Sequence, residues 1–209
     1  MIKDAINGSA RKVPAWLIYI VGILPAAWFL YEGLTGGSGA DPIKALEHEL
    51  GEFALKLLIV GLCITPLRKH LGVNLLKFRR AIGVMTFEYV LLHLLVWLVL
   101  DVQIVSQIWA DIVKRPYITV GMVGFVLMIP LAVTSNNLSV RKLGVRWRKL
   151  HKLTYGIAFL GALHFVMVAK GIQLEPLLYM AVVLGLLALR IPKNSLQFSG
   201  RFTRESVDN

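Results

Sequence analysis

The sequence predicts an all-α integral membrane protein, a six-helix transmembrane bundle with both termini in the cytoplasm. Hydrophobic residues make up 56% of the 209 residues, charged residues make up 17%, and the mean hydropathy is +0.67. A soluble domain has about 45–50% apolar and about 25% charged residues, and a disordered chain needs low hydrophobicity. The composition therefore excludes both classes and favours a membrane protein with several spans.

Each span needs about 20 mostly apolar residues. The six segments that approach this length are residues 13–31, 51–67, 81–100, 116–134, 150–169 and 172–189. The first follows two basic residues, as a signal peptide does, but its apolar run is long and we interpret it as a retained span. The second contains Glu52 and Lys56 in its first turns, where long side chains can reach the interface.

The remaining spans carry few charges. Glu88 is the one charge in the third span, the fourth has none, Lys152 lies at the edge of the fifth, and the sixth is interrupted by Glu175 and Pro176. Among the short loops, Gly36–Gly39 predicts a flexible turn, and Asp41 before Pro42 predicts the start of a short interfacial helix. We expect one domain over residues 1–209, of which 190–209 form a cytoplasmic tail.

The basic residues predict the orientation. With six spans, most of the 23 Lys and Arg residues fall on the side of the termini, and the positive-inside rule makes that side cytoplasmic. The residues on the other side are Lys44, Lys56, Lys114, Arg115 and Lys170. The net charge of +11 therefore reflects topology and attraction to anionic lipid rather than nucleic-acid binding.

Several chemistries are excluded by the motifs. The single cysteine, Cys63, allows neither an intramolecular disulfide nor a CxxC site. Neither GxGxxG nor GxxxxGK[ST] occurs in the sequence, so no nucleotide-binding loop is predicted. The chemistry must therefore come from polar residues within the bilayer, which are expensive to place there and usually functional.

Two histidines fall at similar depth on two predicted spans. At about 1.5 Å per residue, His93 lies about 12 Å below the outer edge at Asp101, and His164 lies about 9 Å below the edge at Lys170. Two axial ligands that hold one planar cofactor across a bundle require this arrangement, and haem iron accepts neutral imidazole. The alternative is that each histidine only forms a hydrogen bond between helices.

A third histidine, His151, lies at the inner mouth of the fifth span. Its spacing of about 20 Å from His164 would suit two haems stacked across the membrane. Thirteen residues turn a helix by about 220°, so the two histidines share one interior only if the helix bends, which Gly156 and Gly161 would permit. Its basic neighbours allow the alternative that His151 is an ordinary interfacial residue.

Other polar residues have weaker indications. Glu88 could support His93 or handle protons, or it could simply pair with a polar partner. The arginines of the basic rim, including Arg79, Arg80 and Arg148, satisfy the positive-inside rule and could also hold haem propionates or a flavin phosphate. His70 and His48 are expected at the inner and outer surfaces respectively.

The three histidines, together with several longer stretches, resemble a known family. The chain is similar to the MsrQ (YedZ) family of haem-binding membrane subunits, within the ferric-reductase-like transmembrane superfamily. The stretches that carry the resemblance are residues 36–58, 91–95, 114–121, 130–135 and 143–165.

This resemblance implies b-type haem, FMN, a location in the bacterial inner membrane and an electron path from membrane quinone. The electrons would pass to a periplasmic molybdopterin subunit that reduces methionine sulfoxide in oxidised proteins. His93, His151 and His164 match the haem histidines of the family. An inner haem with two histidine ligands would need another histidine where Arg79 or Arg80 stands, so either one haem is present or His151 finds a different partner.

Two other functions remain open. One is a stand-alone transmembrane reductase of ferric iron or oxygen, fed by a separate flavin dehydrogenase. The other is a small proton-coupled transporter that uses Glu88 and the histidines as a relay, and such a protein would be colourless. The symmetric halves and broken helices that often mark transporters are not apparent in the sequence.

Overall fold

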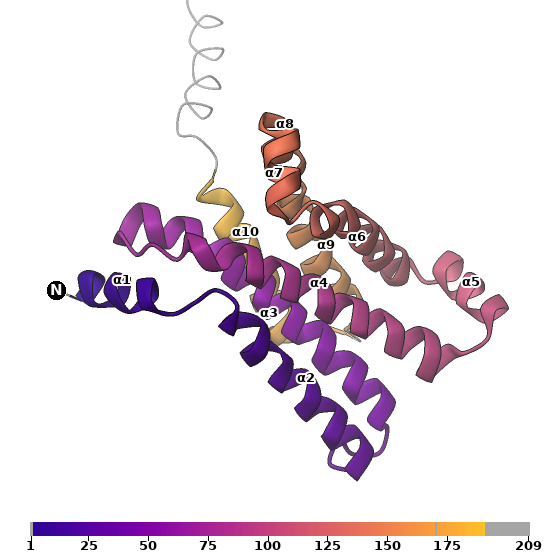
Figure 1. Ribbon diagram of the computed structural model, residues 1–209. Helices are drawn as coiled ribbons and strands as arrows, with labels where there is room; N and C mark the ends of the chain where they lie inside the picture. The colour runs from indigo at the N-terminus through magenta and orange to yellow at the C-terminus, as the bar shows by residue number, and fades with distance from the viewer. Residues whose placement is uncertain (1, 170, 191–209) are drawn as a thin grey trace, which may run out of the picture.

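The computed structural model describes residues 2–169 and 171–190, and within these ranges every regular element is helical (Figure 1). Residues 1, 170 and 191–209, including Lys170 and nearly all of the predicted tail, lie outside the described residues. The helices are α1 (Ile2–Lys12), α2 (Leu17–Thr35), α3 (Pro42–Leu71), α4 (Arg79–Leu95), α5 (Val105–Lys114), α6 (Pro116–Val133), α7 (Asn137–Leu143), α8 (Val145–Leu150), α9 (Leu153–Val168) and α10 (Leu174–Ala188). A 3₁₀ turn, η1 (Leu76–Phe78), precedes α4, and a π-helical segment, η2 (Val96–Val102), follows it.

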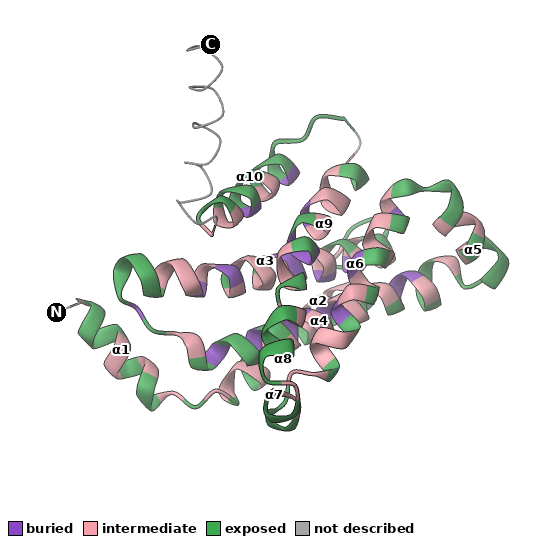
Figure 2. Ribbon diagram, turned by 90° about the horizontal axis from the view of Figure 1, so that it is seen from above, coloured by how far each residue is buried: buried purple, intermediate pink, exposed green. Residues whose placement is uncertain are grey.

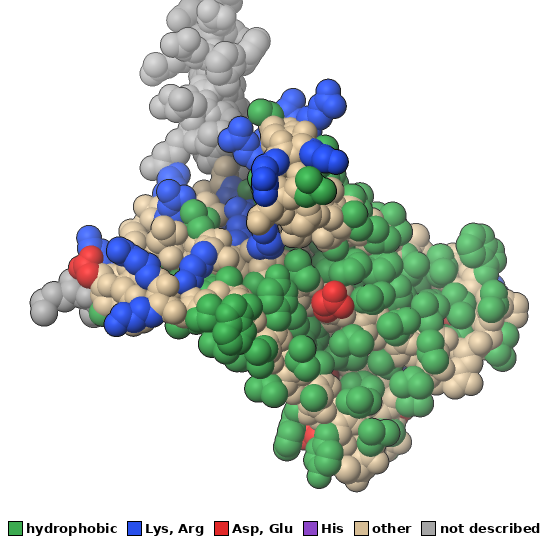
Figure 3. Space-filling view, in the orientation of Figure 1, with side chains coloured by type: hydrophobic (Ala, Val, Ile, Leu, Met, Phe, Trp, Pro, Cys, Tyr) green, Lys and Arg blue, Asp and Glu red, His purple; other side chains and the backbone are tan. Residues whose placement is uncertain are grey.

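Five helical stretches are long and apolar enough to cross a bilayer: Leu17–Thr35, Pro42–Leu71, Leu76–Val102, Pro116–Val133 and Val145–Val168. The sixth segment forms α10, whose 15 residues are fewer than the about 20 that a hydrocarbon core requires. The membrane assignment explains the surface. Figure 3 shows a broad hydrophobic face, and large side chains such as Trp28 and Leu34 of α2 are exposed.

Helix α3 lies at the centre of the bundle. One of its faces packs with α2 and α4 in a cluster of buried residues: Leu46, Leu50, Ala54, Met85, Tyr89 and Val96. Another packs with α9 and α10 through Leu62, Ala158, Ala162 and Val183. The alanines of α9 are fully buried, and small residues of this kind let transmembrane helices approach closely. Helix α6 completes the bundle by packing along α9.

The long α3 corrects the expectation of a separate interfacial helix at Asp41–Pro42. Asp41 caps the helix by accepting a hydrogen bond from the Lys44 amide at 3.2 Å, and Pro42 occupies the first turn. The hydrogen bond and ion pair with Lys44 lower the pKa of Asp41. Since no helix-breaking residue separates this start from the predicted span at residue 51, α3 continues without interruption.

Two of the charges inside α3 pair with each other. The Lys56 ammonium lies 2.6 Å from the Glu52 carboxylate, and the Tyr179 hydroxyl donates to the same carboxylate at 2.8 Å. Pairing at i and i+4 offsets the cost of placing two charges in a membrane helix. The same carboxylate also joins α3 to α10.

The remaining helices lie at the ends of the bundle. Figure 2 shows α5, α7 and α8 as mostly exposed, and none of the three contains a buried residue. Lys and Arg side chains gather at one end of the molecule, over α1, α7 and α8 (Figure 3). This basic end also carries the last turn of α3, with Arg68 and Lys69, and the start of α4, with Arg79 and Arg80.

Candidate functional site

The site is built around His93, in the last turn of α4. Its Nδ1 lies 2.8 Å from the carbonyl oxygen of Glu47 on α3. A carbonyl only accepts hydrogen bonds, so Nδ1 must carry the proton, and the neutral ring then keeps the lone pair on Nε2. The contact therefore leaves the Nε2 lone pair of His93 available for a further partner, as in histidines that bind metals.

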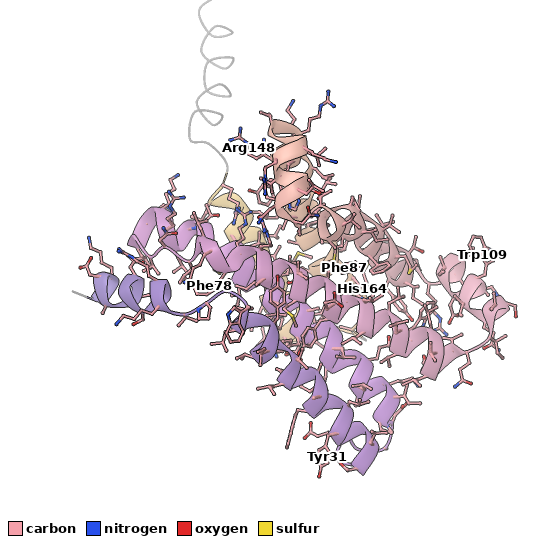
Figure 4. The ribbon with its side chains drawn as sticks, in the orientation of Figure 1. Tyr31, Phe78, Phe87, Trp109, Arg148 and His164 are labelled. Carbon is pink, nitrogen blue, oxygen red and sulfur yellow. The ribbon has the colours of Figure 1, made fainter. Side chains whose placement is uncertain are left out.

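His164, in the last two turns of α9, repeats this arrangement. Its Nδ1 lies 2.7 Å from the carbonyl oxygen of Tyr117, in the first turn of α6. By the same reasoning, the proton is on Nδ1 and the lone pair is on Nε2. Figure 4 labels His164 in the middle of the molecule, and its side chain is half-buried.

The two imidazole rings face a common space. Their centroids are 6.2 Å apart, and their planes are inclined by 81°. Two metal–nitrogen bonds of about 2 Å each, with each ring centre about 1 Å further back, also add to about 6 Å. The pair is therefore at the right separation to ligate one metal ion from opposite sides.

A metal ion bound by protein alone usually needs four ligands, whereas a haem iron needs only two because the macrocycle supplies the others. The described residues contain no group of three or more His, Cys, Asp or Glu side chains that could hold a metal ion. The donor set of His93 and His164 thus fits a haem. The structure brings these two histidines together, as their matched depth indicated.

A cavity of about 900 Å³ contains both histidines, and cofactor pockets typically measure about 300–1,000 Å³. Much of its wall is apolar, and the contributing side chains include Leu55, Leu58, Val90, Leu94, Phe125 and Ile157. Phe125 of α6 stacks on Phe87 of α4, with ring centroids 5.8 Å apart and planes inclined by 8°. This contact holds together the two helices that form one wall of the cavity.

Charged residues line the cavity at the end of the molecule opposite the basic end. Lys44 and Glu47 come from the start of α3, Asp101 from η2, and Arg115 from the turn before α6. Arg115 is ion-paired with Asp111 at 3.2 Å. The cavity therefore combines an apolar interior with a rim of mixed charge, as a site for an amphipathic cofactor requires.

His151 does not line this cavity. It lies in the turn between α8 and α9, so the helix is interrupted at His151 and Lys152, whereas α9 is continuous through Gly156 and Gly161. Its Nε2 lies 3.1 Å from the Thr134 hydroxyl, and its ring stacks on Trp147 with centroids 3.9 Å apart. His151 thus belongs to a separate polar cluster near the basic end.

The predicted arginines also lie away from the cavity. Arg80 donates to the Asn137 side chain at 2.7 Å. Arg79 is close enough to His151 to act on it electrostatically, and Figure 4 shows Arg148 on α8, remote from His164. All three residues lie at the basic end rather than beside the histidine pair.

Three further polar residues can now be placed. Glu88 is exposed on α4 and does not line the cavity, so it cannot support His93 directly. His48 does line the cavity, and its ring centroid is 5.6 Å from that of Phe165. His70 is exposed in the last turn of α3, as expected for a surface residue.

Sequence reasoning missed the partners of the histidines. The acceptors are backbone carbonyls of Glu47 and Tyr117, which leave no side-chain signature. Two glycines, Gly51 and Gly121, lie against the imidazole rings. The one signal in the sequence that could have indicated these contacts was a glycine at the depth of each histidine. Depth alone, however, does not say which face of its helix the glycine occupies.

Comparisons with known proteins agree with this architecture. Residues 50–162 match the family model described as the ferric reductase like transmembrane component. A protein of Agrobacterium fabrum is 46% identical over 197 residues, which cover 93% of this chain and 92% of the relative. Proteins of Brucella anthropi and Brucella ovis are each 49% identical, over 84% and 87% of this chain and 80% and 83% of the relatives respectively.

All three relatives are named protein-methionine-sulfoxide reductase heme-binding subunit MsrQ. Such identity over most of both chains, together with the matched domain, shows a shared family rather than a shared fold alone. The chain therefore belongs to the MsrQ family and contains a ferric-reductase-like transmembrane domain.

Proposed function

We propose that this protein is a haem b electron-transfer subunit of a membrane-bound system that reduces methionine sulfoxide in proteins. The observation that carries the proposal is the pair His93 and His164, whose rings are 6.2 Å apart and whose Nδ1 atoms each contact a backbone carbonyl. The names of the relatives support both haem binding and the reductase system.

In this proposal, His93 and His164 would hold the haem iron through Nε2, and the apolar wall of the cavity would surround the macrocycle. Lys44 and Arg115, on the charged rim, are suited to the carboxylates of the haem, because both offer charged hydrogen-bond donors. When bound, the haem supplies a site that accepts and releases one electron at a time.

The chain then controls how this site reacts. Two histidine ligands leave no open position on the iron, and such iron transfers electrons rather than binding oxygen. The apolar side chains keep water from the site, and the carbonyls of Glu47 and Tyr117 fix the tautomer and orientation of the two imidazoles. This chemistry favours electron transfer over oxygen binding at the iron.

The proposed topology has six spans in the bacterial inner membrane, with both termini cytoplasmic. The basic end would then face the cytoplasm, in accordance with the positive-inside rule, and the histidine pair would lie toward the periplasm. This position favours delivery of electrons to a periplasmic molybdopterin-containing reductase subunit, whose active site would carry out the reduction. Carboxylates near this end, such as Glu49, could steer that partner electrostatically.

Electrons would come from the membrane quinone pool. FMN is proposed near the basic end, where Arg79, Arg80 and Arg148 can bind a phosphate and where Trp147 offers an aromatic face. His151 lies in the same cluster. In that position it is an accessory residue for the inner carrier, and the alternative is that it ligates a second haem.

The proposal is tested by the reduced-minus-oxidised visible spectrum of the purified protein, with a pyridine haemochrome assay for haem per chain. We expect a low-spin b-type spectrum, about one haem per chain, and a ferrous spectrum unchanged by carbon monoxide because the iron has no open position. A colourless protein would refute electron transfer and favour a transporter. A ferrous spectrum that shifts with carbon monoxide would instead show an open position on the iron and would refute ligation by both histidines.

A further inference from the structure

Each histidine of the pair packs against a glycine on the neighbouring helix. An ideal Cβ placed on Gly51 would lie 3.0 Å from Nδ1 and 3.2 Å from Cε1 of His93. An ideal Cβ on Gly121 would lie 3.0 Å from both Cε1 and Nδ1 of His164. Ordinary contacts between such atoms are about 3.5–4.0 Å, so each ring would have to shift by a few tenths of an ångström beside an alanine.

Each glycine lies one helical turn after the carbonyl that its histidine contacts. Glu47 precedes Gly51 by one turn in α3, and Tyr117 precedes Gly121 by one turn in α6. In an α-helix the carbonyl of residue i already accepts from the N–H of residue i+4, which here is the glycine. The imidazole reaches the second lone pair of that oxygen by lying over the glycine, where a side chain would otherwise stand.

The same arrangement occurs in two helix pairs. Helices α3 and α4 pack closely along their lengths, and so do α6 and α9. In each pair, the first helix supplies the carbonyl and the glycine, and the second supplies the histidine. The number of residues between the glycine and the histidine is also similar in the two pairs, from 51 to 93 and from 121 to 164, although no repeat is evident in the sequence.

We propose that Gly51 and Gly121 are positioning residues for the histidine pair. Because each glycine lacks a side chain, one imidazole can pack directly against the helix backbone. Nδ1–H can then donate to the carbonyl one turn earlier, and Nε2 is directed to the metal. This inference rests on the proposed haem function and assigns a role to two residues that are neither ligands nor polar.

The packing of each imidazole on its glycine has two chemical consequences. It sets the orientation of the ring, and hence of its Nε2 lone pair. The hydrogen bond to the carbonyl also raises the basicity of the imidazole, which stabilises ferric iron relative to ferrous iron. A side chain in place of either glycine should therefore weaken haem binding and raise the midpoint potential of the haem.

The experiment compares Gly51→Ala and Gly121→Ala with Gly61→Ala on α3 and Gly156→Ala on α9. A Cβ at Gly61 would lie 3.6 Å from its nearest neighbour, which is ordinary contact, and a Cβ at Gly156 would meet nothing within 4 Å. All four substitutions replace a helical glycine by the better helix former. The full-length proteins are purified in detergent, and haem per chain, midpoint potential, low-spin electron paramagnetic resonance and thermal unfolding of the haem-free protein are measured.

We expect Gly51→Ala and Gly121→Ala to lower haem affinity by about 10- to 100-fold, as changes to groups that support metal ligands commonly do. If ferric affinity falls about tenfold more than ferrous affinity, the midpoint potential rises by about 59 mV. The low-spin resonance should also shift, because it reports the orientation and basicity of the axial imidazoles. The haem-free variants should unfold no more easily than the parent, and both controls should keep the parent spectrum and potential.

The outcomes separate the two proposals. If the parent protein binds haem through two histidines but both alanine variants keep its affinity, resonance and potential, the positioning role is wrong and the haem function stands. If the two controls lose haem to the same extent as the two test variants, general helix packing explains the result and the positioning role is again refuted. A parent protein without haem would refute the proposed function itself.

Discussion

The guanidinium of Arg190 donates a hydrogen bond to the carbonyl oxygen of Leu62, at 2.5 Å. In α3 that carbonyl would normally accept from the N–H of residue 66, but residue 66 is a proline and has none. A carbonyl without a partner in hydrocarbon is costly, so the arginine supplies the hydrogen bond that the proline removes. The same guanidinium donates to the Tyr155 hydroxyl at 2.9 Å and thereby ties the end of α10 to α3 and α9.

Replacement of Arg190 by methionine is expected to destabilise the protein by about 1–3 kcal/mol, because it leaves the Leu62 carbonyl without a partner. The free energy of unfolding can be measured by denaturant titration in detergent micelles. The loss should be smaller in a Pro66→Ala background, where residue 66 regains its N–H. An equal loss in both backgrounds would show that the Leu62 carbonyl is not the reason.

A second proline in a helix explains the contacts of Tyr89, which is almost fully buried. Pro25 lies inside α2, and near it the Tyr89 hydroxyl donates to the Gly22 carbonyl at 2.5 Å and accepts from the Ala26 amide at 3.0 Å. The hydroxyl thus contacts both backbone groups of an i, i+4 pair next to the proline, and a side chain inserted at such a point is a known cause of helix bending. This contact joins α4, which carries His93, to α2.

Replacement of Tyr89 by phenylalanine should cost about 1–3 kcal/mol of unfolding free energy, because two buried backbone groups lose their partner. Thermal unfolding and denaturant titration of the haem-free protein would measure the loss. Tyr31→Phe is the matched control, since Tyr31 is 58% exposed and should change stability little. If both variants unfold alike, the hydroxyl bridge contributes nothing to stability.

The helical architecture could be predicted because each apolar segment is long and bounded by charge. The similar depth of His93 and His164 followed from counting residues to the nearest charges, and the ring separation of 6.2 Å agrees with it. Counting gives height in the membrane but not the direction in which a side chain points. The contacts with Glu47, Tyr117, Gly51 and Gly121 therefore required the packed structure.

Other differences have local causes. The start of α3 at Pro42 follows from the Asp41 cap, and Glu52 and Lys56 further along the helix pair with each other, whereas a hydropathy window counts these residues only as charges. His151 lies in the turn between α8 and α9 rather than within one straight helix, and residue counting does not show where such a turn falls. The six-span count, the cytoplasmic termini and the haem ligands stay predictions until topology and haem content are measured.

The histidine pair predicts a clear loss of haem on substitution. His93→Gly and His164→Gly should each lose most of the haem, since one axial bond is removed, and added imidazole should restore part of the low-spin spectrum by filling the vacated space. Haem per chain and the visible spectrum measure both effects. His70→Ala is the control, because His70 is exposed at the end of α3, and retention of a normal spectrum by both glycine variants would refute the ligand assignment.

Substitution of His151 tests whether the protein holds one haem or two. His151→Ala should leave haem per chain unchanged, because His151 lies outside the cavity of the histidine pair and its Nε2 contacts the Thr134 hydroxyl. Trp147→Phe serves as the companion variant, since it keeps an aromatic ring against His151 while removing the indole hydrogen bond to the Thr134 carbonyl at 2.8 Å. If His151→Ala instead halves the haem content and Trp147→Phe does not, His151 is an iron ligand. The Thr134 contact would then have to break when an inner haem binds, and the cluster near the basic end would be a second haem site rather than a site for FMN.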